Sequence, residues 1–398
     1  MDFSDFVMST KLNAPRVGIN LLERPRLWEI LKQYTSRNLT LITAPAGYGK
    51  TMLISQFSTR ITAPTAWYHL DKYDNDLILF IQHLLAGIDR FLPGVITDML
   101  HLVEQQPNPN GETRRIASAL VNSLDDRMEE ELILAIDDYH AIRENAVHSF
   151  MEQLLHYLPE NMHIFMSSRS KPPLNLERLR VAGLLEEINL QELRFTREEI
   201  ADFLLNENNE PVSSETVTFL EEITEGWPAA LRLAGITMFN SRESYKPEKR
   251  EFVPNRKEIF HYLAEEVLRD MPDDLFDFVV STSVLDLITP EICDLFLERE
   301  DSRQVLENLD SQNLFIITLE GEYQVYRYHP LFKEFLRSQL SEKKKKALFE
   351  NGGKSYLQAG FPSHAIECFL RAGDYVQALS AIEITGNKML LYNRWQTI

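Results

Sequence analysis

Cysteine is almost absent from this 398-residue chain, and its scarcity limits the chemistry available. The two cysteines, Cys293 and Cys368, form no metal or redox motif, so each is expected to be a buried or free thiol in a reducing compartment. The N-terminus lacks the basic start and apolar core of a signal peptide. No apolar run approaches the roughly 18–20 residues of a membrane span. The sequence therefore predicts a cytoplasmic protein with no membrane partner.

Positive charge is also scarce, with 41 lysines and arginines against 60 acidic residues and a formal net charge of -19. A surface this acidic repels phosphate backbones, which makes direct DNA binding by this chain a poor hypothesis. The basic run Lys343–Lys346 is interpreted as a solvated helix face. Hydrophobic residues make up 44% of the chain, enough for several cores, and the length predicts two to four domains.

The first half of the chain alternates short apolar runs with helical patterns. Strands separated by helices are typical of a parallel sheet with right-handed crossovers, and near-continuous apolar strands fit a sheet covered on both faces. The fold class is therefore α/β, with a nucleotide-binding domain over residues 1–190. The expected strands are Leu39–Thr43, Thr65–Leu70, Leu132–Ile136, His163–Ser167 and Leu185–Leu190.

The second half is mainly helical. Thr196 and Glu199 form a capping box that begins a small helical domain over 191–250, which ends in a polar linker at 241–254. Helices followed by the hairpin Leu314–Leu319 and Tyr323–Tyr328 predict a winged-helix unit over 251–342. Residues 343–398 are expected to form a helical arm, the beginning of a repeat array that needs about three repeats for stability. The chain is therefore interpreted as the N-terminal part of a longer protein.

The strongest motif is APAGYGKT, Ala44–Thr51, between a strand and a helix. That context fits a phosphate-binding loop, in which glycines let backbone N–H groups surround phosphate and the helix N-terminus favours negative charge. The strict pattern begins with glycine where this chain has Ala44, and the alternative is a plain glycine turn. Lys50 is expected to reach the β- and γ-phosphates and Thr51 to bind Mg²⁺. The expected nucleotide contacts are Pro45, Ala46, Gly47, Tyr48, Gly49, Lys50, Thr51 and Met52.

A second motif, LILAIDD, ends a buried strand in two carboxylates. Asp137 is predicted to hold Mg²⁺, and Asp138 to orient or deprotonate the attacking water. Strands often end in aspartate, so this motif depends on the phosphate loop for its meaning. Arg169 follows the next strand, where a cation can sense the γ-phosphate, and a surface arginine is the alternative. His140 is interpreted as structural.

At this point the sequence resembles a known family. APAGYGKT, AIDDYH, SSRSKPPLNLERLR, TEGWPAALRLA and YRYHPLFKEFLRSQL occur in the order seen in STAND ATPases, and they look most like the branch of the maltose-regulon activator, within the LuxR-type regulators. The resemblance implies a nucleotide-binding domain, a helical domain, a winged helix that acts as an internal lock, and a helical arm.

The resemblance also implies roles for three further residues. Arg24 matches the family's N-terminal arginine segment near the nucleotide. Pro228 matches the proline that packs on adenine, with a helix-starting proline as the alternative. His329 matches the winged-helix histidine that contacts the β-phosphate of ADP, with a core histidine as the alternative.

The leading hypothesis is a switch that binds ATP or ADP with Mg²⁺ and hydrolyses ATP slowly. By resemblance, it rests with ADP and self-associates when ATP and an inducer, a small molecule or a protein, open it. DNA would be bound only through a domain outside this chain. Two alternatives remain: a true catalytic ATPase or kinase, and a solenoid binding module with a vestigial nucleotide site.

Overall fold

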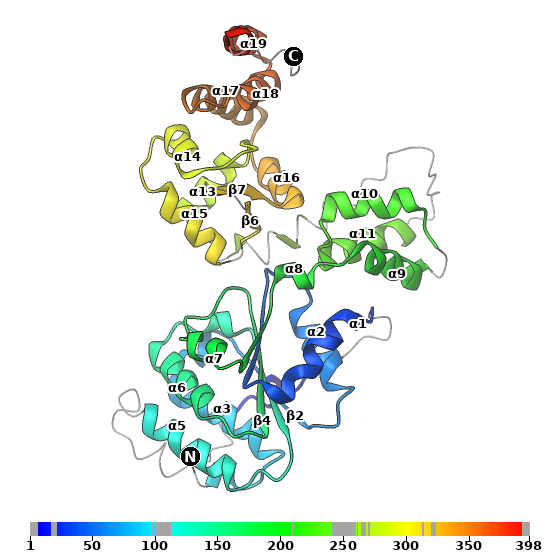
Figure 1. Cartoon of the computed structure of the whole chain (residues 1–398), viewed down its shortest axis with the longest axis vertical. Coiled ribbons are helices and arrows are strands. Elements are labelled where there is room, and N and C mark those ends of the chain that lie inside the picture. The colour runs from blue at the N-terminus through cyan, green and yellow to red at the C-terminus, as the bar shows by residue number, and fades with distance from the viewer. Residues whose placement is uncertain are drawn as a thin grey trace. The chain divides into compact units, whose positions relative to one another are not determined.

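The computed structural model describes residues 7–16, 22–97, 99, 113–208, 211–240, 260, 262–263, 268–269, 271–312, 314–319 and 324–391. The chain divides into two compact units. The first comprises Met1–Thr218 and Gly226–Phe239, and the second comprises Phe219–Glu225 and Asn240–Ile398. Figure 1 shows the elements of both units.

The first unit is built on a five-stranded sheet with the order β2-β3-β4-β1-β5, and every pair in it is parallel. The order places β4 between β1, which leads into the phosphate loop, and β3, which ends in the paired aspartates. Loops at the carboxyl ends of parallel strands meet at one edge of the sheet, where such folds bind ligands. The strands are β1 Leu39–Thr43, β2 Thr65–His69, β3 Leu132–Asp137, β4 Met162–Ser168 and β5 Leu185–Ile188.

Helices cover both faces of this sheet because alternate strand side chains point to opposite sides. The main core lies on the face covered by α3 Leu77–Asp89, α5 Thr113–Asp125 and α6 Asn145–His156. An aromatic cluster fills the other face, where Phe165 of β4 packs edge-on against Phe57 at 5.5 Å. Phe57 belongs to α2 Lys50–Ser58, and α1 Pro25–Leu31 adds Trp28 to the cluster.

Short helices connect the sheet to a helical segment of the first unit. These are α7 Glu177–Val181 and α8 Leu190–Leu193, followed by α9 Arg197–Asn208, α10 Ser214–Thr224 and α11 Pro228–Asn240. The predicted capping box is present at the beginning of α9: the amide of Glu199 donates to Thr196 Oγ1, and the amide of Thr196 donates to the Glu199 carboxylate. The unit boundary lies within α10, between Thr218 and Phe219, and the chain returns to the first unit at Gly226, before α11.

The second unit contains a winged helix followed by packed helices. An antiparallel hairpin pairs β6 Ile316–Leu319 with β7 Val325–Tyr328, and Ile288 makes a further bridge to Tyr326. The helices of the winged helix are α13 Asp273–Thr282, α14 Pro290–Leu297, α15 Ser302–Ser311 and α16 Pro330–Ser338. They are followed by α17 Glu342–Gln358, α18 Pro362–Ala372 and α19 Tyr375–Leu391.

The close packing of α17 on α18 depends on Gly353. A Cβ there would lie 2.5 Å from the Phe369 ring, so glycine lets the ring rest on the helix backbone. Cys293 and Cys368 are buried and free, as the sequence predicted.

The predicted fold class is confirmed, and each of the five predicted strands is present. Helix α15 was not predicted, because its polar sequence SRQVLENLDS shows little apolar signal outside Leu306 and Leu309, which are buried. The predicted linker at 241–254 lies outside the described residues, and the domain boundaries at 190, 250 and 342 stay predictions. In the part of the chain that the structure describes, no helix is long and apolar enough to cross a membrane.

Candidate nucleotide-binding site

The phosphate loop runs from the end of β1 into α2. Gly47 and Gly49 both have φ near +77°, the left-handed conformation that costs other residues energy. Nothing lies within 4 Å of a Cβ built on Gly49, so the backbone turn, not a lack of space, explains glycine there. The two glycines therefore define the turn of the loop, which ends at the N-terminus of α2, where an anion is stabilised.

Lys50 lies inside this loop. Its Nζ donates to the carbonyls of Ala44 at 2.8 Å and Pro45 at 2.9 Å, and the residue is only 6% exposed. Burial lowers the pKa of Lys50 to about 8, with Asp138 acting in the opposite direction and Arg169 adding to the decrease. An anion in the loop would raise this pKa again, which is the effect expected of a phosphate bound beside this lysine.

Asp137 lies opposite Thr51 at the end of β3. Thr51 Oγ1 donates to Asp137 Oδ1 at 2.9 Å, and Ser167 Oγ donates to the same oxygen at 2.5 Å. A hydroxyl and a carboxylate held together are oxygen donors of the kind that Mg²⁺ takes, together with water and phosphate oxygens. These two residues fit the predicted metal site.

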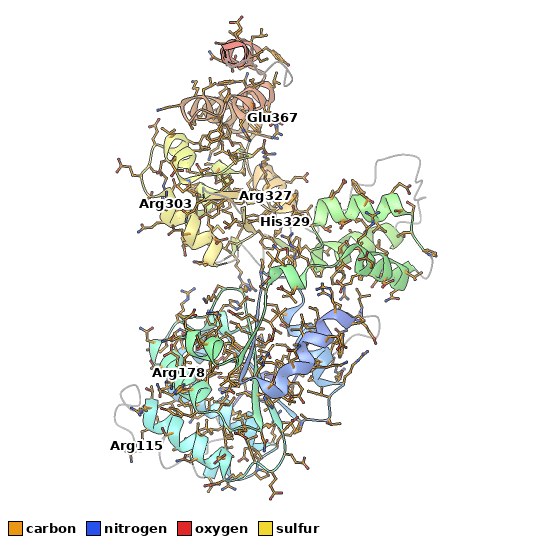
Figure 2. The ribbon with its side chains drawn as sticks, in the orientation of Figure 1. Arg115, Arg178, Arg303, Arg327, His329 and Glu367 are labelled. Atoms are coloured by element: carbon orange, nitrogen blue, oxygen red, sulfur yellow. The ribbon has the colours of Figure 1, made fainter. Side chains whose placement is uncertain are left out.

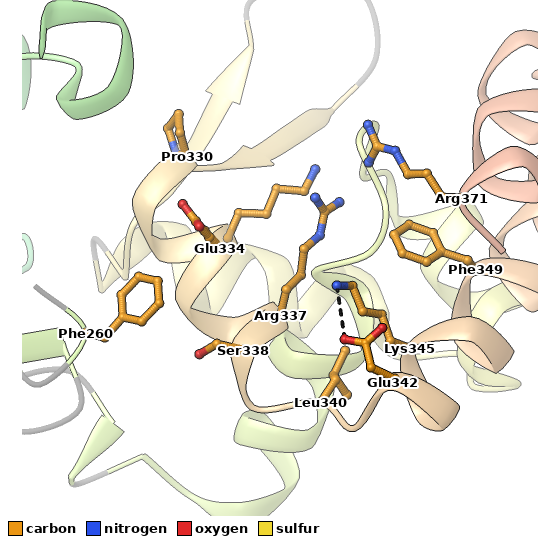
Figure 3. A pocket seen from close by; sticks show the side chains of 11 residues that line it. Phe260, Pro330, Glu334, Arg337, Ser338, Leu340, Glu342, Lys345, Phe349 and Arg371 are labelled. Atoms are coloured by element: carbon orange, nitrogen blue, oxygen red, sulfur yellow. Dashed lines mark ion pairs between the residues drawn. The ribbon is translucent and has the colours of Figure 1, made fainter. Parts of the chain in front are cut away.

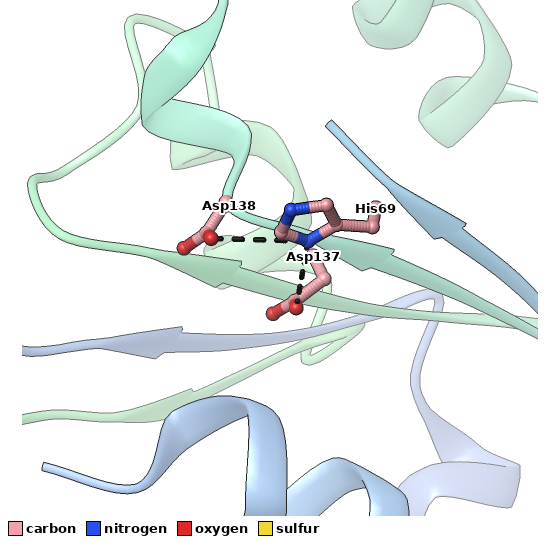
Figure 4. Close-up of side chains that lie close together, drawn as sticks. All are labelled: His69, Asp137 and Asp138. Carbon is pink, nitrogen blue, oxygen red and sulfur yellow. Dashed lines mark hydrogen bonds and ion pairs between the residues drawn. The ribbon is translucent and has the colours of Figure 1, made fainter. Parts of the chain in front are cut away.

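The strand register brings His69 to the same place, because His69 of β2 is paired with Asp137 of β3. His69 Nδ1 donates to Asp137 Oδ2 at 3.3 Å and lies 3.8 Å from Asp138 Oδ2, as Figure 4 shows. Within the described part of the chain, these three residues are the group whose possible ligand atoms all lie within 4.8 Å of one another. The hydrogen bond with Asp137 raises the pKa of His69.

The two aspartates differ in their protonation equilibria. Burial raises the pKa of Asp137, but hydrogen bonds from His69, Ser167 and Thr51 outweigh it and hold the pKa below the ordinary value. Burial, with the charge of Asp137 second, raises the pKa of Asp138. A carboxylate that stays ionised suits metal binding, and one with a raised pKa suits proton transfer.

Asp138 has an unusual backbone. It adopts φ 60° and ψ 43°, the left-handed region, and its amide donates to Ser167 Oγ at 3.0 Å. Strained non-glycine residues of this kind collect at functional sites. The sharp turn leaves an oxygen of each aspartate close to His69 Nδ1, at 3.3 and 3.8 Å, so the two adjacent carboxylates converge on that ring.

Arg169 and His140 complete the charged surroundings. The charge of Arg169 acts on Lys50 and Asp138, which places its guanidinium near the loop. Burial lowers the pKa of His140 to about 3, and Arg169 and Lys50 add to the effect, so this ring is neutral at physiological pH. His140 Nδ1 lies 3.7 Å from Asp138 Oδ1. The residue that the sequence indicated as structural therefore lies beside the proposed base.

Helix α11 begins directly on the phosphate loop. The amide of Ala229 donates to the Gly47 carbonyl at 3.1 Å, and Trp227 Nε1 donates to the Ala46 carbonyl at 3.1 Å. The indole also stacks on Tyr48, with ring centroids 6.4 Å apart. Pro228 is the first residue of this helix and so lies next to the loop, and its predicted packing on adenine stays a prediction.

Arg24 and His329 have other partners in the structure. Arg24 donates to the Glu199 carboxylate at 3.1 and 3.2 Å and to the Arg194 carbonyl at 2.7 Å. His329 belongs to the second unit, where its Nε2 donates to the Thr224 carbonyl at 2.9 Å. Their predicted roles near the nucleotide stay predictions.

An ion pair lies close to the hydrogen bond of His329. Arg327 on β7 makes a two-pronged pair with Glu225, at 2.6 and 3.1 Å, and Figure 2 labels Arg327 and His329 close together. Because Arg327 of β7 and His329, which follows that strand, both bind this segment, they fix Thr224 and Glu225 within the second unit.

Three residues of the site escaped the sequence-based prediction. His69 is recognisable only from the register of β2 on β3, since no motif contains it. Ser167 precedes the predicted Arg169, and a hydroxyl at a strand end was available as a signal. Trp227 lies in the quoted motif EGWPAAL, and a tryptophan directly before a helix-starting proline was the signal there.

Comparison with known proteins agrees with this geometry. The MalT winged helix domain model matches residues 264–348. The HTH-type transcriptional regulator MalT of Yersinia enterocolitica is 32% identical over 375 residues, covering 92% of this chain and 41% of that protein. MalT of Vibrio parahaemolyticus is 29% identical over 393 residues, covering 98% of this chain and 43% of that protein.

The chain resembles the MalT regulators. It spans less than half the length of these relatives. A solved Walker-type ATPase of Pyrococcus abyssi matches the fold with a TM-score of 0.53 at 16% identity, covering 83% of this chain and all of that one. The MalT-like chain therefore carries a P-loop ATPase fold and a winged helix.

Proposed function

We propose that this MalT-like chain is the nucleotide-dependent switch of a transcription regulator. The observation that carries the proposal is the meeting of Lys50, Thr51 and Asp137 at one edge of the sheet, with Asp138 and Arg169 beside them. Lys50 and the loop amides would bind the phosphates, and Thr51 and Asp137 would hold Mg²⁺, which neutralises phosphate charge when bound.

The proposed roles of the remaining residues follow from their pKa values and positions. Asp138 accepts a proton from the attacking water, because its pKa is raised, and Arg169 senses the γ-phosphate. Helix α11 moves when the conformation of the phosphate loop changes, because its first turn is hydrogen-bonded to Ala46 and Gly47. Pro228 packs on adenine, Arg24 lies near the nucleotide, and His329 contacts the β-phosphate of ADP in the resting state.

The rest of the proposal concerns the whole protein. ADP is held at rest, and ATP with an inducer, a small molecule or a protein, leads to self-association. DNA is bound by a domain outside this chain, as the name of the relatives, HTH-type transcriptional regulator, indicates for them. A cytoplasmic location stays a prediction.

The nucleotide that copurifies with the chain tests this proposal. We expect ADP after denaturation of the purified protein, and turnover of about 10⁻² s⁻¹ or slower, the range of regulatory P-loop enzymes. Turnover of many molecules per second without retained nucleotide would indicate a catalytic ATPase. No binding of ATP or ADP in calorimetry would leave a binding module with a vestigial site.

A further inference from the structure

A cavity of about 820 Å³ lies in the second unit, away from the phosphate loop in sequence and assigned to no function above. Its walls come from α16, α17 and α18, with Phe260 at one side, as Figure 3 shows. A volume of this size is typical of small-molecule sites. Four cationic side chains line it: Lys333, Arg337, Lys345 and Arg371.

Three of these cations share one carboxylate. The Asp286 carboxylate forms ion pairs with Lys333 at 2.5 Å, Arg371 at 3.2 Å and Arg337 at 3.5 Å. Burial lowers the pKa of both Lys333 and Arg337, so each loses hydration that the single carboxylate does not replace. Arg371 also pairs with Glu367 at 3.5 Å, so three positive charges against two carboxylates leave about one uncompensated charge at this corner of the cavity.

The other charged residues of the wall do not remove this excess. Lys345 pairs with Glu342 at 3.7 Å, and the Glu342 side chain is 90% exposed, so that pair is close to neutral. Glu334 lies on the side of the cavity nearer Phe260, whereas the Arg337 and Arg371 groups gather beside Phe349 in Figure 3. The cavity therefore has a cationic end in a chain whose net charge is -19.

An aromatic ring forms part of the same end. The guanidinium groups of Arg337 and Arg371 lie 5.6 and 5.8 Å from the centre of the Phe349 ring. Arg337 is also fixed by bonds to the Ser283 and Val284 carbonyls, at 2.8 and 3.1 Å. Two oriented guanidinium groups with an apolar surface between them suit a ligand with an anionic head and a less polar body.

We propose that this cavity binds a small organic phosphate monoester. A monoester carries about -1.5 to -2 charges at pH 7, opposite in sign to the uncompensated charge of this corner, and its three oxygens can accept from lysine and both arginines. The winged helix contributes Lys333 and Arg337, and the arm contributes Arg371, so the ligand would join the two parts of the second unit. The inference goes beyond the nucleotide switch and does not depend on it.

Binding of glucose 6-phosphate to the full chain tests the proposal, with glucose as the uncharged control. We expect calorimetry to detect the phosphate ester and to find glucose at least about tenfold weaker. Arg371→Gln should weaken the ester by about tenfold or more, whereas Lys346→Gln, which removes a charge from the same region of α17 but does not line the cavity, should change affinity less than about twofold. Glu342→Gln should tighten binding, because it removes a negative charge from the wall.

A second experiment distinguishes this site from the phosphate loop. Lys50→Ala should leave binding of glucose 6-phosphate unchanged. Loss of binding in Lys50→Ala with none in Arg371→Gln would place the ester in the loop and overturn the proposal. Arg371→Gln could instead only lower the melting temperature, while the ester does not raise the melting temperature of the unmodified chain. In that case the cations serve only to hold the helices together, and the proposal is wrong. Inorganic phosphate binding as tightly as the ester would also contradict it, since no organic body would then be recognised.

Discussion

Lys50 shows at the scale of a single residue how burial suits a cation to an anionic ligand. Its charge is buried against two carbonyls, and burial lowers its pKa to about 8. The arrangement costs free energy that a bound phosphate would recover, because charge-assisted bonds are about twice as strong as neutral ones. The same residue that the motif indicated is therefore a buried cation suited to binding an anion.

Lys50→Ala should abolish tight nucleotide binding while the fold remains intact. The substitution removes the buried cation, and losing a hydrogen bond to a charged group costs about 1.5–3 kcal/mol, a rise of about 10- to 150-fold in the Kd of ADP. Calorimetry with ADP and ATP measures it, and circular dichroism checks the fold. An unchanged affinity in the folded variant would remove the phosphate loop from the site.

Asp137→Asn and Asp138→Asn should separate the two carboxylates. Asp137 bonds Thr51, so its loss should remove the Mg²⁺ dependence of ATP binding. Asp138 has a raised pKa and a different backbone direction, so its loss should mainly slow hydrolysis, by about 10²- to 10⁴-fold for a general base. Titrations of ATP with and without Mg²⁺, and single-turnover rates, measure both. Equal loss of ATP binding in the two variants would contradict this division.

At the scale of an element, α11 is the part of the first unit that the loop holds most directly. Two hydrogen bonds and one aromatic stack attach its first turn to Ala46, Gly47 and Tyr48. A helix begins readily at proline, because the missing N–H would be unpaired there anyway. The helix therefore starts at a fixed point on the loop, and a change in the loop moves the helix.

Trp227→Phe should weaken nucleotide binding by about two- to tenfold. It removes one buried hydrogen bond, worth about 0.5–1.5 kcal/mol, and leaves the Ala46 carbonyl without its partner. Trp28→Phe is the matched control, because Trp28 is also a buried tryptophan of the first unit but its Nε1 has no hydrogen-bond partner in the described structure. Fluorescence titration with a labelled ADP compares the two. Equal effects would mean that lost packing, not the bond to the loop, is responsible.

At the scale of the whole molecule, the short segment around Glu225 and Gly226 connects the two units. Thr224 and Glu225 are bonded to His329 and Arg327 of the second unit, and Trp227 is bonded to the phosphate loop of the first. A ligand shifts an equilibrium between two conformations only by its different affinity for them. Interactions made by His329 are therefore expected to bias the conformation that holds ADP.

His329→Ala should loosen the ADP state. If the histidine bonds a phosphate in that state, its loss costs about 1.5–3 kcal/mol there and nothing in the open form. ADP should dissociate about tenfold faster or more. Stopped-flow displacement of a labelled ADP and thermal stability with and without ADP measure the effect. An unchanged off-rate, with an equal loss of melting temperature in both conditions, would leave His329 as a packing residue bonded to Thr224.

The sequence by itself determined the features that depend on local order along the chain. Apolar runs between helical patterns gave all five strands, and a strand, a glycine-bearing turn and a helix in sequence gave the phosphate loop around Lys50. Thr196 and Glu199 gave the beginning of α9, because a capping box needs only residues three apart. The order of five motifs gave the resemblance to the family of the maltose-regulon activator.

Tertiary structure alone decided which distant residues meet. The register of β2 on β3 places His69 beside Asp137, and a shift of one residue would have turned His69 to the other face. Packing brings Arg371 of α18 to Asp286, and only then does a cavity with an excess of cations exist. Periodicity reports which face of an element is buried, but the partner on that face is set by side-chain fit across elements far apart in sequence.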